Sequence, residues 1–186
     1  MGLKDIQKEF VKLSLNKEAR EDAFDSDSIG SNEFEHLKLA INRHAYSLIR
    51  KRLGVVKSIL RITRMVMGDA FDEEFIKFAQ VSEVPSGINR HRKDSIMFAD
   101  WLVNLKRGSK LFQPLKVLLS HELQPIHMWM NKKSFSIKCY NRSPHQMMDF
   151  CENSLPISKA RICPTIVIWW ETRRGVSCYR WQSFSL

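Results

Sequence analysis

The sequence has no long apolar run. Its longest hydrophobic stretches, such as Thr165–Trp170, are far too short to cross a bilayer. The opening residues, MGLKDIQKEF, also lack the apolar segment of a secretory signal. We therefore expect a cytoplasmic protein that neither spans nor binds a membrane.

Metal and catalytic motifs are missing as well. No Gly-rich phosphate loop, HExxH, GxSxG or EF-hand spacing occurs, and the six histidines are scattered. The four cysteines form no CxxC or CxxxC pair, which argues against a zinc ribbon and favours incidental, reduced thiols. They are Cys139, Cys151, Cys163 and Cys178. The sequence predicts no metal, cofactor or catalytic residue in this chain.

Acidic residues are scarce in the C-terminal part. Residues 109–186 contain 11 Lys or Arg and 4 Asp or Glu, a net charge of +7, whereas residues 1–108 have a net charge of +3. A positive charge of this kind attracts nucleic acid, an acidic peptide or an acidic protein surface equally well. Charge alone therefore does not select the partner.

The run from Ile41 to Gly68 has seven Lys or Arg and no acid. Its apolar residues recur at steps of three and four, which is typical of one face of a helix. They are Ile41, Ala45, Leu48, Ile49, Leu53, Val56 and Leu60. Acids follow directly after Gly68, where they suit the N-terminus of a second helix. The cationic face over Arg43–Arg64 could contact DNA phosphates or could simply be solvated.

The remaining periodicity predicts an N-terminal helical domain over residues 1–108. We expect helices over residues 3–20, from about residue 32 to 53, and over 55–67, 70–81 and 94–106, with a loop over 21–32 and a possible kink at Gly54.

After Gly108 the helical spacing gives way to short apolar or alternating segments, so residues 109–186 predict a small α+β domain. Short strands are expected at Leu115–Leu119, Ile126–Met130 and Ser134–Tyr140, and a short helix at Pro144–Glu152. The segment Thr165–Glu171 is β-branched and aromatic, a turn follows at residues 172–175, and Val176–Trp181 alternates, so a β-hairpin ends the chain. The fold class is α+β with a small antiparallel sheet.

A small sheet must end at an edge strand, and an edge strand can accept an extended peptide as a further strand. Arg173, Arg174 and Arg180 would form a basic rim beside such an edge. An edge that is closed or covered is the alternative.

The segment TRMVMGDAFDEEFIKFAQ resembles the helix–Gly–helix segment of a bacterial family long labelled a DNA-binding domain. In that family a basic helix leads to an apolar pair, a glycine and a helix that contains Phe. The matching residues are Val66, Met67, Gly68, Phe71 and Phe75. The short apolar segments at Pro114–Leu119, Pro125-Ile with Trp129, and Ile166–Trp169 follow in the family's order, so the resemblance covers roughly residues 34–182.

The resemblance implies a function for the chain. Members of this family are partners of multinuclear iron enzymes that oxidise cysteines in ribosomally made precursor peptides. It implies a heterodimer with an MbnB-like iron enzyme, which holds the iron and converts cysteines of an MbnA-like precursor peptide to oxazolone–thioamide groups. This chain would be a non-catalytic subunit that binds the peptide's leader.

With the hairpin edge, this interpretation selects a peptide-binding site. The expected residues are Arg173, Arg174, Val176, Ser177, Tyr179 and Trp181. Two alternatives stay open: a DNA-binding transcriptional regulator that uses the basic helix 43–64, and an enzyme in its own right with a His/Cys site.

Overall fold

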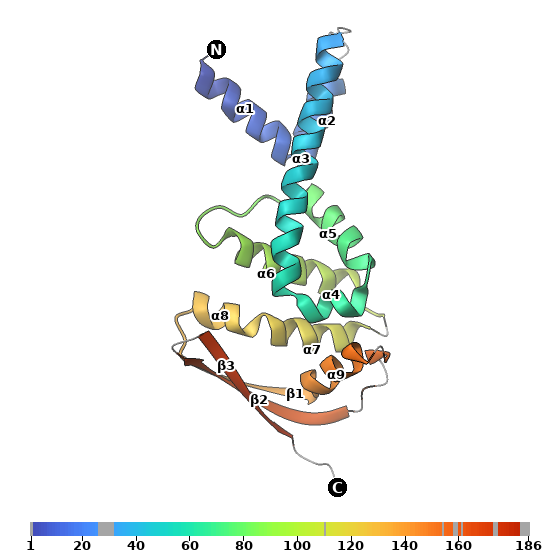
Figure 1. Ribbon diagram of the computed structural model, residues 1–186, viewed down its shortest axis with the longest axis vertical. Coiled ribbons are helices and arrows are strands. Elements are labelled where there is room, and N and C mark those ends of the chain that lie inside the picture. The colour runs from blue at the N-terminus through green and yellow to red at the C-terminus, as the bar shows by residue number, and fades with distance from the viewer. Residues whose placement is uncertain are drawn as a thin grey trace. The chain divides into compact units, whose positions relative to one another are not determined.

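A computed structural model describes residues 2–25, 32–109, 111–153, 155–157, 160, 162–172 and 175–182 (Figure 1). The helices are α1 (Leu3–Leu15), α2 (Lys17–Asp25), α3 (Asn32–Ile59), α4 (Arg61–Met67), α5 (Ala70–Val81), α6 (Arg90–Leu105), α7 (Phe112–Glu122), α8 (Gln124–Met130) and α9 (Pro144–Glu152). The strands are β1 (Phe135–Arg142), β2 (Ile162–Thr172) and β3 (Gly175–Gln182). The predicted α+β class is confirmed.

Contacts within the chain group these elements into two compact units. The first unit comprises residues 1–56 and 72–94, and the second comprises residues 57–71 and 95–186. This grouping differs from the predicted division at residues 108/109. The reason is that packing joins distant segments: α4 contacts α7 and α9, and the ring of Phe71 packs edge-on against that of Phe98.

The first unit is helical and buries the predicted stripe of α3. Ile41, Ala45, Leu53 and Val56 are buried, as the spacing predicted. The helix continues through Gly54 to Ile59, so Gly54 does not interrupt it. The predicted loop over 21–32 is wrong at its start, because α2 extends to Asp25; residues 26–31 lie outside the described part of the chain.

Arg52 belongs to the basic run, yet its side chain is buried. Its guanidinium donates to both carboxylate oxygens of Asp94, at 2.9 Å and 2.7 Å, and lies near the rings of Phe75 and Phe78. A bidentate Arg–carboxylate pair in such surroundings is a structural contact. One of the seven cations is thus removed from any nucleic-acid surface.

In the second unit, α4 begins without a cap of its own. Its N-cap residue, Leu60, has an apolar side chain that cannot accept a hydrogen bond. Glu122 at the end of α7 supplies the acceptor instead. The N–H groups of Ile62 and Thr63 donate to the Glu122 carboxylate at 2.6 Å and 3.0 Å, and the Thr63 hydroxyl donates at 2.6 Å. A carboxylate at a helix N-terminus satisfies free N–H groups and complements the helix dipole.

Two predicted strands are wrong. Leu115–Leu119 lies in α7 and Ile126–Met130 lies in α8. The segment Leu115–Leu119 has four apolar residues in five positions, and periodicity cannot distinguish a helix from a buried strand over so short an apolar run. Pro125, in the first turn of α8, needs no N–H there and is compatible with helix.

The remaining predictions for this part are confirmed. Helix α9 has the predicted bounds, strand β1 covers most of Ser134–Tyr140, and β2 and β3 form the C-terminal antiparallel hairpin. The sheet has three strands in the order β1-β2-β3, so β2 is central. In Figure 1, α7 and α8 lie along one side of this sheet.

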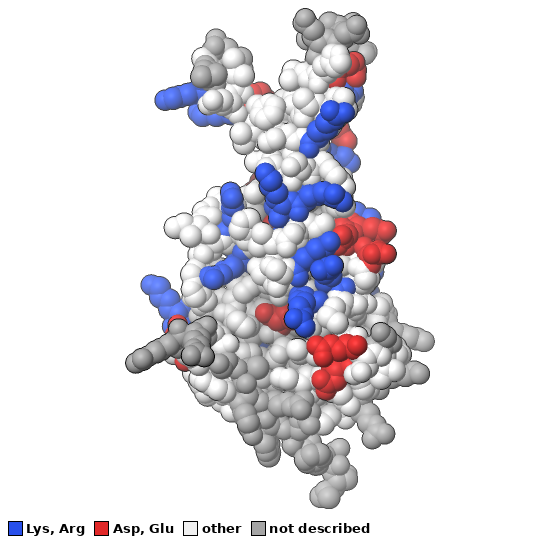
Figure 2. Space-filling model, in the orientation of Figure 1, with Lys and Arg blue, Asp and Glu red and all other residues white. Residues whose placement is uncertain are grey.

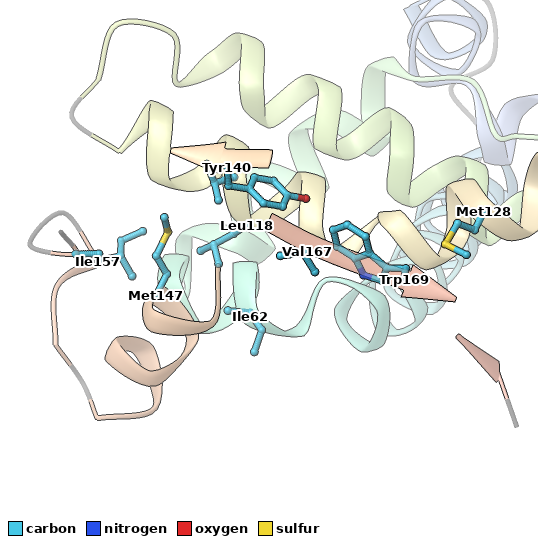
Figure 3. Close-up of a cluster of buried hydrophobic side chains, with 10 residues drawn as sticks. Ile62, Leu118, Met128, Tyr140, Met147, Ile157, Val167 and Trp169 are labelled. Carbon is cyan, nitrogen blue, oxygen red and sulfur yellow. The ribbon is translucent and has the colours of Figure 1, made fainter. Parts of the chain in front are cut away.

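The core of the second unit lies between these helices and the sheet. Figure 3 shows Val167 and Trp169 from β2 and Tyr140 from β1 beside Leu118 of α7, with Met147 of α9 and Ile62 of α4 close by. The rings of Tyr140 and Trp169 meet edge-on, with centroids 6.3 Å apart. The sheet is therefore held by its inner face.

Candidate functional site

Strand β3 is an edge of the described sheet. It pairs with β2 from Thr165↔Gln182 to Thr172↔Gly175, and no described strand pairs with its other side. An edge strand presents N–H and C=O groups that a further strand can pair with. Strand β1 forms the second edge and pairs with β2 alone among the strands described.

The outer face of the sheet is apolar and exposed. Phe135 and Ile137 of β1 are 55% and 53% exposed, and Trp170 of β2 is 37% exposed. They lie together because Phe135 is paired with Trp170 and Ile137 with Ile168. We call the apolar residues of this surface the outer apolar face: Phe135, Ile137, Ile166, Ile168 and Trp170. Large hydrophobic side chains gathered on one exposed surface are typical of an interaction surface.

The inner face alternates with the outer one, as strand geometry requires. In β2, Thr165, Val167 and Trp169 are buried, while the residues between them are more exposed. In β1, Tyr140 is buried and Cys139 is exposed. The outer apolar face is therefore distinct from the core face and is not needed to hold the sheet to its helices.

The predicted peptide-binding residues fall into three groups. Arg173 and Arg174 lie outside the described residues. Val176 is half-buried and packs against the core cluster, which places it with the core. Ser177, Tyr179 and Trp181 lie at register positions paired with Trp170, Ile168 and Ile166 of the outer apolar face; their side chains are outside the described part.

A row of polar groups lies beneath the sheet, between α7 and β1. The Lys138 ammonium donates to the Ser120 hydroxyl at 2.9 Å, and that hydroxyl lies 3.5 Å from the Tyr140 hydroxyl. Burial lowers the pKa of Lys138 and raises the pKa of Tyr140 to about 12. At neutral pH the tyrosine is a protonated phenol.

His121 lies next to this row. Its ring contacts those of His145 and Trp169, with centroids 5.1 Å and 5.4 Å away. Burial, then the charges of His145 and Lys138, lower the pKa of His121 to about 4. Its Nδ1 is buried and has no hydrogen-bond partner among the residues that the structure describes. A neutral imidazole held this way packs between aromatic rings rather than exchanging protons near pH 7.

The sequence interpretation missed both the outer apolar face and the polar row. The alternation Phe135–Ile137–Cys139 against Lys138–Tyr140 was a signal for two faces, since residues two apart share a side of a strand. The polar row was not predicted, because part of α7 was interpreted as a strand and not as a helix that places Ser120 and His121 against β1.

The described residues offer neither a metal-ligand cluster nor a membrane-spanning helix, and the chain has no match among known proteins. Among the described residues, no group of three or more His, Cys, Asp or Glu side chains could hold a metal ion. No described helix is long and apolar enough to cross a bilayer. No family model, curated protein or solved structure matches this chain.

Proposed function

We propose that this chain is a non-catalytic subunit that binds the leader of a Cys-containing precursor peptide and supports a multinuclear iron enzyme. The proposed reaction class is the oxidation of peptide cysteines to oxazolone–thioamide groups with dioxygen. The segments that resemble the iron-enzyme partner family look most like the methanobactin biosynthesis protein MbnC. In this proposal the MbnB-like partner holds the iron and performs the chemistry.

The observation that carries the proposal is the edge of β3, with which no further described strand pairs, beside the outer apolar face. An added strand would obtain affinity from main-chain hydrogen bonds and register from pockets for alternate side chains. An added strand would have β3 as its direct neighbour, beside positions 177, 179 and 181, whose register partners in β2 belong to the outer apolar face. The net charge of +7 over residues 109–186 favours an acidic peptide.

The sharpest test uses proline at two consecutive positions of β3. In an antiparallel ladder, one residue directs its N–H toward the partner strand and the next directs it away. Of Ser177→Pro and Cys178→Pro, one should keep its thermal midpoint and lose affinity for a fluorescent MbnA-type leader peptide. The other should lose a β2–β3 hydrogen bond and stability. The alanine variants at both positions are the controls.

Charge reversal distinguishes the two edges. Arg173→Glu/Arg174→Glu should weaken leader binding about tenfold or more, whereas the matched pair Lys132→Glu/Lys133→Glu before β1 should change it little. The reverse pattern would move the site to the β1 edge. Proline variants that fold and bind the leader like the wild type at both positions would contradict strand addition.

The functional assay adds the iron enzyme. The chain, an MbnB-type enzyme and the precursor peptide are mixed with dioxygen, and the peptide mass and complex size are measured. Peptide modification should require both proteins, and the chain alone should leave the peptide unchanged. A chain that modified the peptide unaided would favour the alternative of an enzyme in its own right.

The DNA-binding alternative rests on the basic helix. Figure 2 shows many Lys and Arg side chains on the face in view. Arg43, Arg50 and Lys51 of α3 are exposed, but Arg52 is paired with Asp94. A regulator should bind duplex DNA with an affinity that falls steeply with salt, and Arg43→Glu should weaken it. Filter binding between about 50 and 200 mM salt tests this.

A further inference from the structure

A cavity of about 320 Å³ lies within the first unit. Its walls come from α1, α3, the segment before α6 and the first turns of α6. The lining residues are Val11, Ser14, Leu15, His44, Leu48, Lys51, Arg52, Val84, Pro85, Arg90, His91 and Asp94. Its volume is at the lower end of the range for small-molecule sites, about 300–1,000 Å³.

A side-chain hydrogen bond connects the α1 wall of the cavity to α3. The hydroxyl of Ser14, which is buried, lies 3.2 Å from Nδ1 of His44. The same wall presents Val11 and Leu15, and Leu48 of α3 and Pro85 face the cavity as well. These side chains offer an apolar ligand a largely hydrocarbon surface.

The charges at this cavity are positive and only partly compensated. Asp94 is the one acid among the lining residues, and both of its carboxylate oxygens accept from Arg52. Lys51 and Arg90 also line the cavity, and within the described part of the chain neither has a carboxylate partner. Arg90 Nε instead donates to Nε2 of His91 at 3.5 Å, a long hydrogen bond.

We infer that this cavity binds a small amphipathic carboxylate, an apolar chain of medium length with one anionic head group. The chain would lie against Val11, Leu48 and Pro85, and the carboxylate would be held by Lys51 and Arg90. Arginine suits this role because its planar fork matches a carboxylate. The site goes beyond the proposed peptide-binding function and does not depend on it.

Calorimetry with the full chain tests the inference, using sodium decanoate as the ligand. Decanoate should bind, while decylamine, with the opposite charge, and acetate, without the apolar chain, should not. Lys51→Ala and Arg90→Ala should each weaken decanoate binding about tenfold, since each removes a hydrogen bond to a charged group. Lys93→Ala, an exposed cation of α6 outside the cavity, is the matched control and should bind like the wild type.

A second variant tests the cavity itself. Val11 is exposed on one side, so Val11→Trp should fold and block the cavity, abolishing binding while the circular dichroism spectrum is retained. The inference is overturned if the wild type does not bind decanoate or if decylamine binds equally well. Unchanged affinity in Lys51→Ala/Arg90→Ala, or in a folded Val11→Trp, would also overturn it.

Discussion

At the residue scale, two polar side chains of the second unit have roles set by their tertiary contacts. Glu122 caps α4 from another helix, and His121 packs among His145, Tyr140 and Trp169. Neither role follows from composition, because each depends on which group the fold brings within reach. A lone histidine in a sequence is equally compatible with a metal ligand, a catalytic base or a core residue.

The buried His121 should make stability depend on pH. Its pKa is about 4 in the folded chain and 6.5 when unperturbed, so the unfolded state binds more protons between these values. The stabilisation is complete above about pH 6.5 and is lost as the pH falls through about 4. Its size is at most about 3 kcal/mol. Urea unfolding of the wild type and His121→Leu at pH 7 and pH 4.5 measures it.

The expected result is a wild-type loss between these pH values that is smaller in His121→Leu. His36 is exposed on α3, and His36→Gln is the control variant, a histidine substitution outside the core. His127, whose pKa burial also lowers, is expected to leave a residual dependence in every variant. Equal pH dependence in wild type and His121→Leu would contradict the assignment.

At the element scale, the boundary between α4 and α5 was predicted correctly, whereas the predicted helix over residues 3–20 is two helices and α6 begins at Arg90 instead of residue 94. The glycine at position 68 and the acids after it marked the end of one helix and the start of the next, and α5 has the expected bounds. The same local signals could not classify α7, because its apolar run Leu115–Leu119 is too short for periodicity to separate a helix from a buried strand. A glycine followed by acids therefore placed one boundary well, whereas a short buried apolar run did not identify its element.

Two glycines in the basic run should respond in opposite directions to alanine. Gly68 ends α4 with φ 57° and ψ −136°, a conformation that side chains disfavour, so Gly68→Ala should destabilise by about 1–3 kcal/mol. Gly54 lies inside α3 with open space where a Cβ would be, so Gly54→Ala should stabilise by about 1 kcal/mol. Differential scanning calorimetry of the two variants decides, and midpoints shifted in the same direction would refute the contrast.

At the scale of the whole molecule, the second unit covers one face of its sheet and leaves the other apolar. Figure 1 shows α7 and α8 on the same side of the strands, and Phe135 and Ile137 of the outer apolar face are more than half exposed. A surface of this kind is what a protein or peptide partner can cover. The proposed leader site at β3 adjoins this region.

Charged substitutions on the outer apolar face should separate binding from folding. Phe135→Lys and Ile137→Lys should leave the thermal midpoint within a few degrees of wild type, because both side chains are already exposed. They should weaken association with the MbnB-type enzyme or the leader, measured by size-exclusion chromatography and fluorescence anisotropy. Val167→Lys, at a fully buried position of β2, is the contrasting variant and should unfold the unit. Full binding by folded Ile137→Lys would exclude the outer apolar face as the contact.

The sequence by itself determined the α+β class, the amphipathic α3, the Phe-bearing α5, α9 and the terminal hairpin, because local periodicity and turn residues encode them. Tertiary structure decided which partner each group meets. It buried Arg52 against Asp94, used Glu122 to cap α4, turned two apolar runs into helices and left one sheet face open. Those outcomes depend on contacts between residues far apart in the chain, whose pairing local pattern cannot specify.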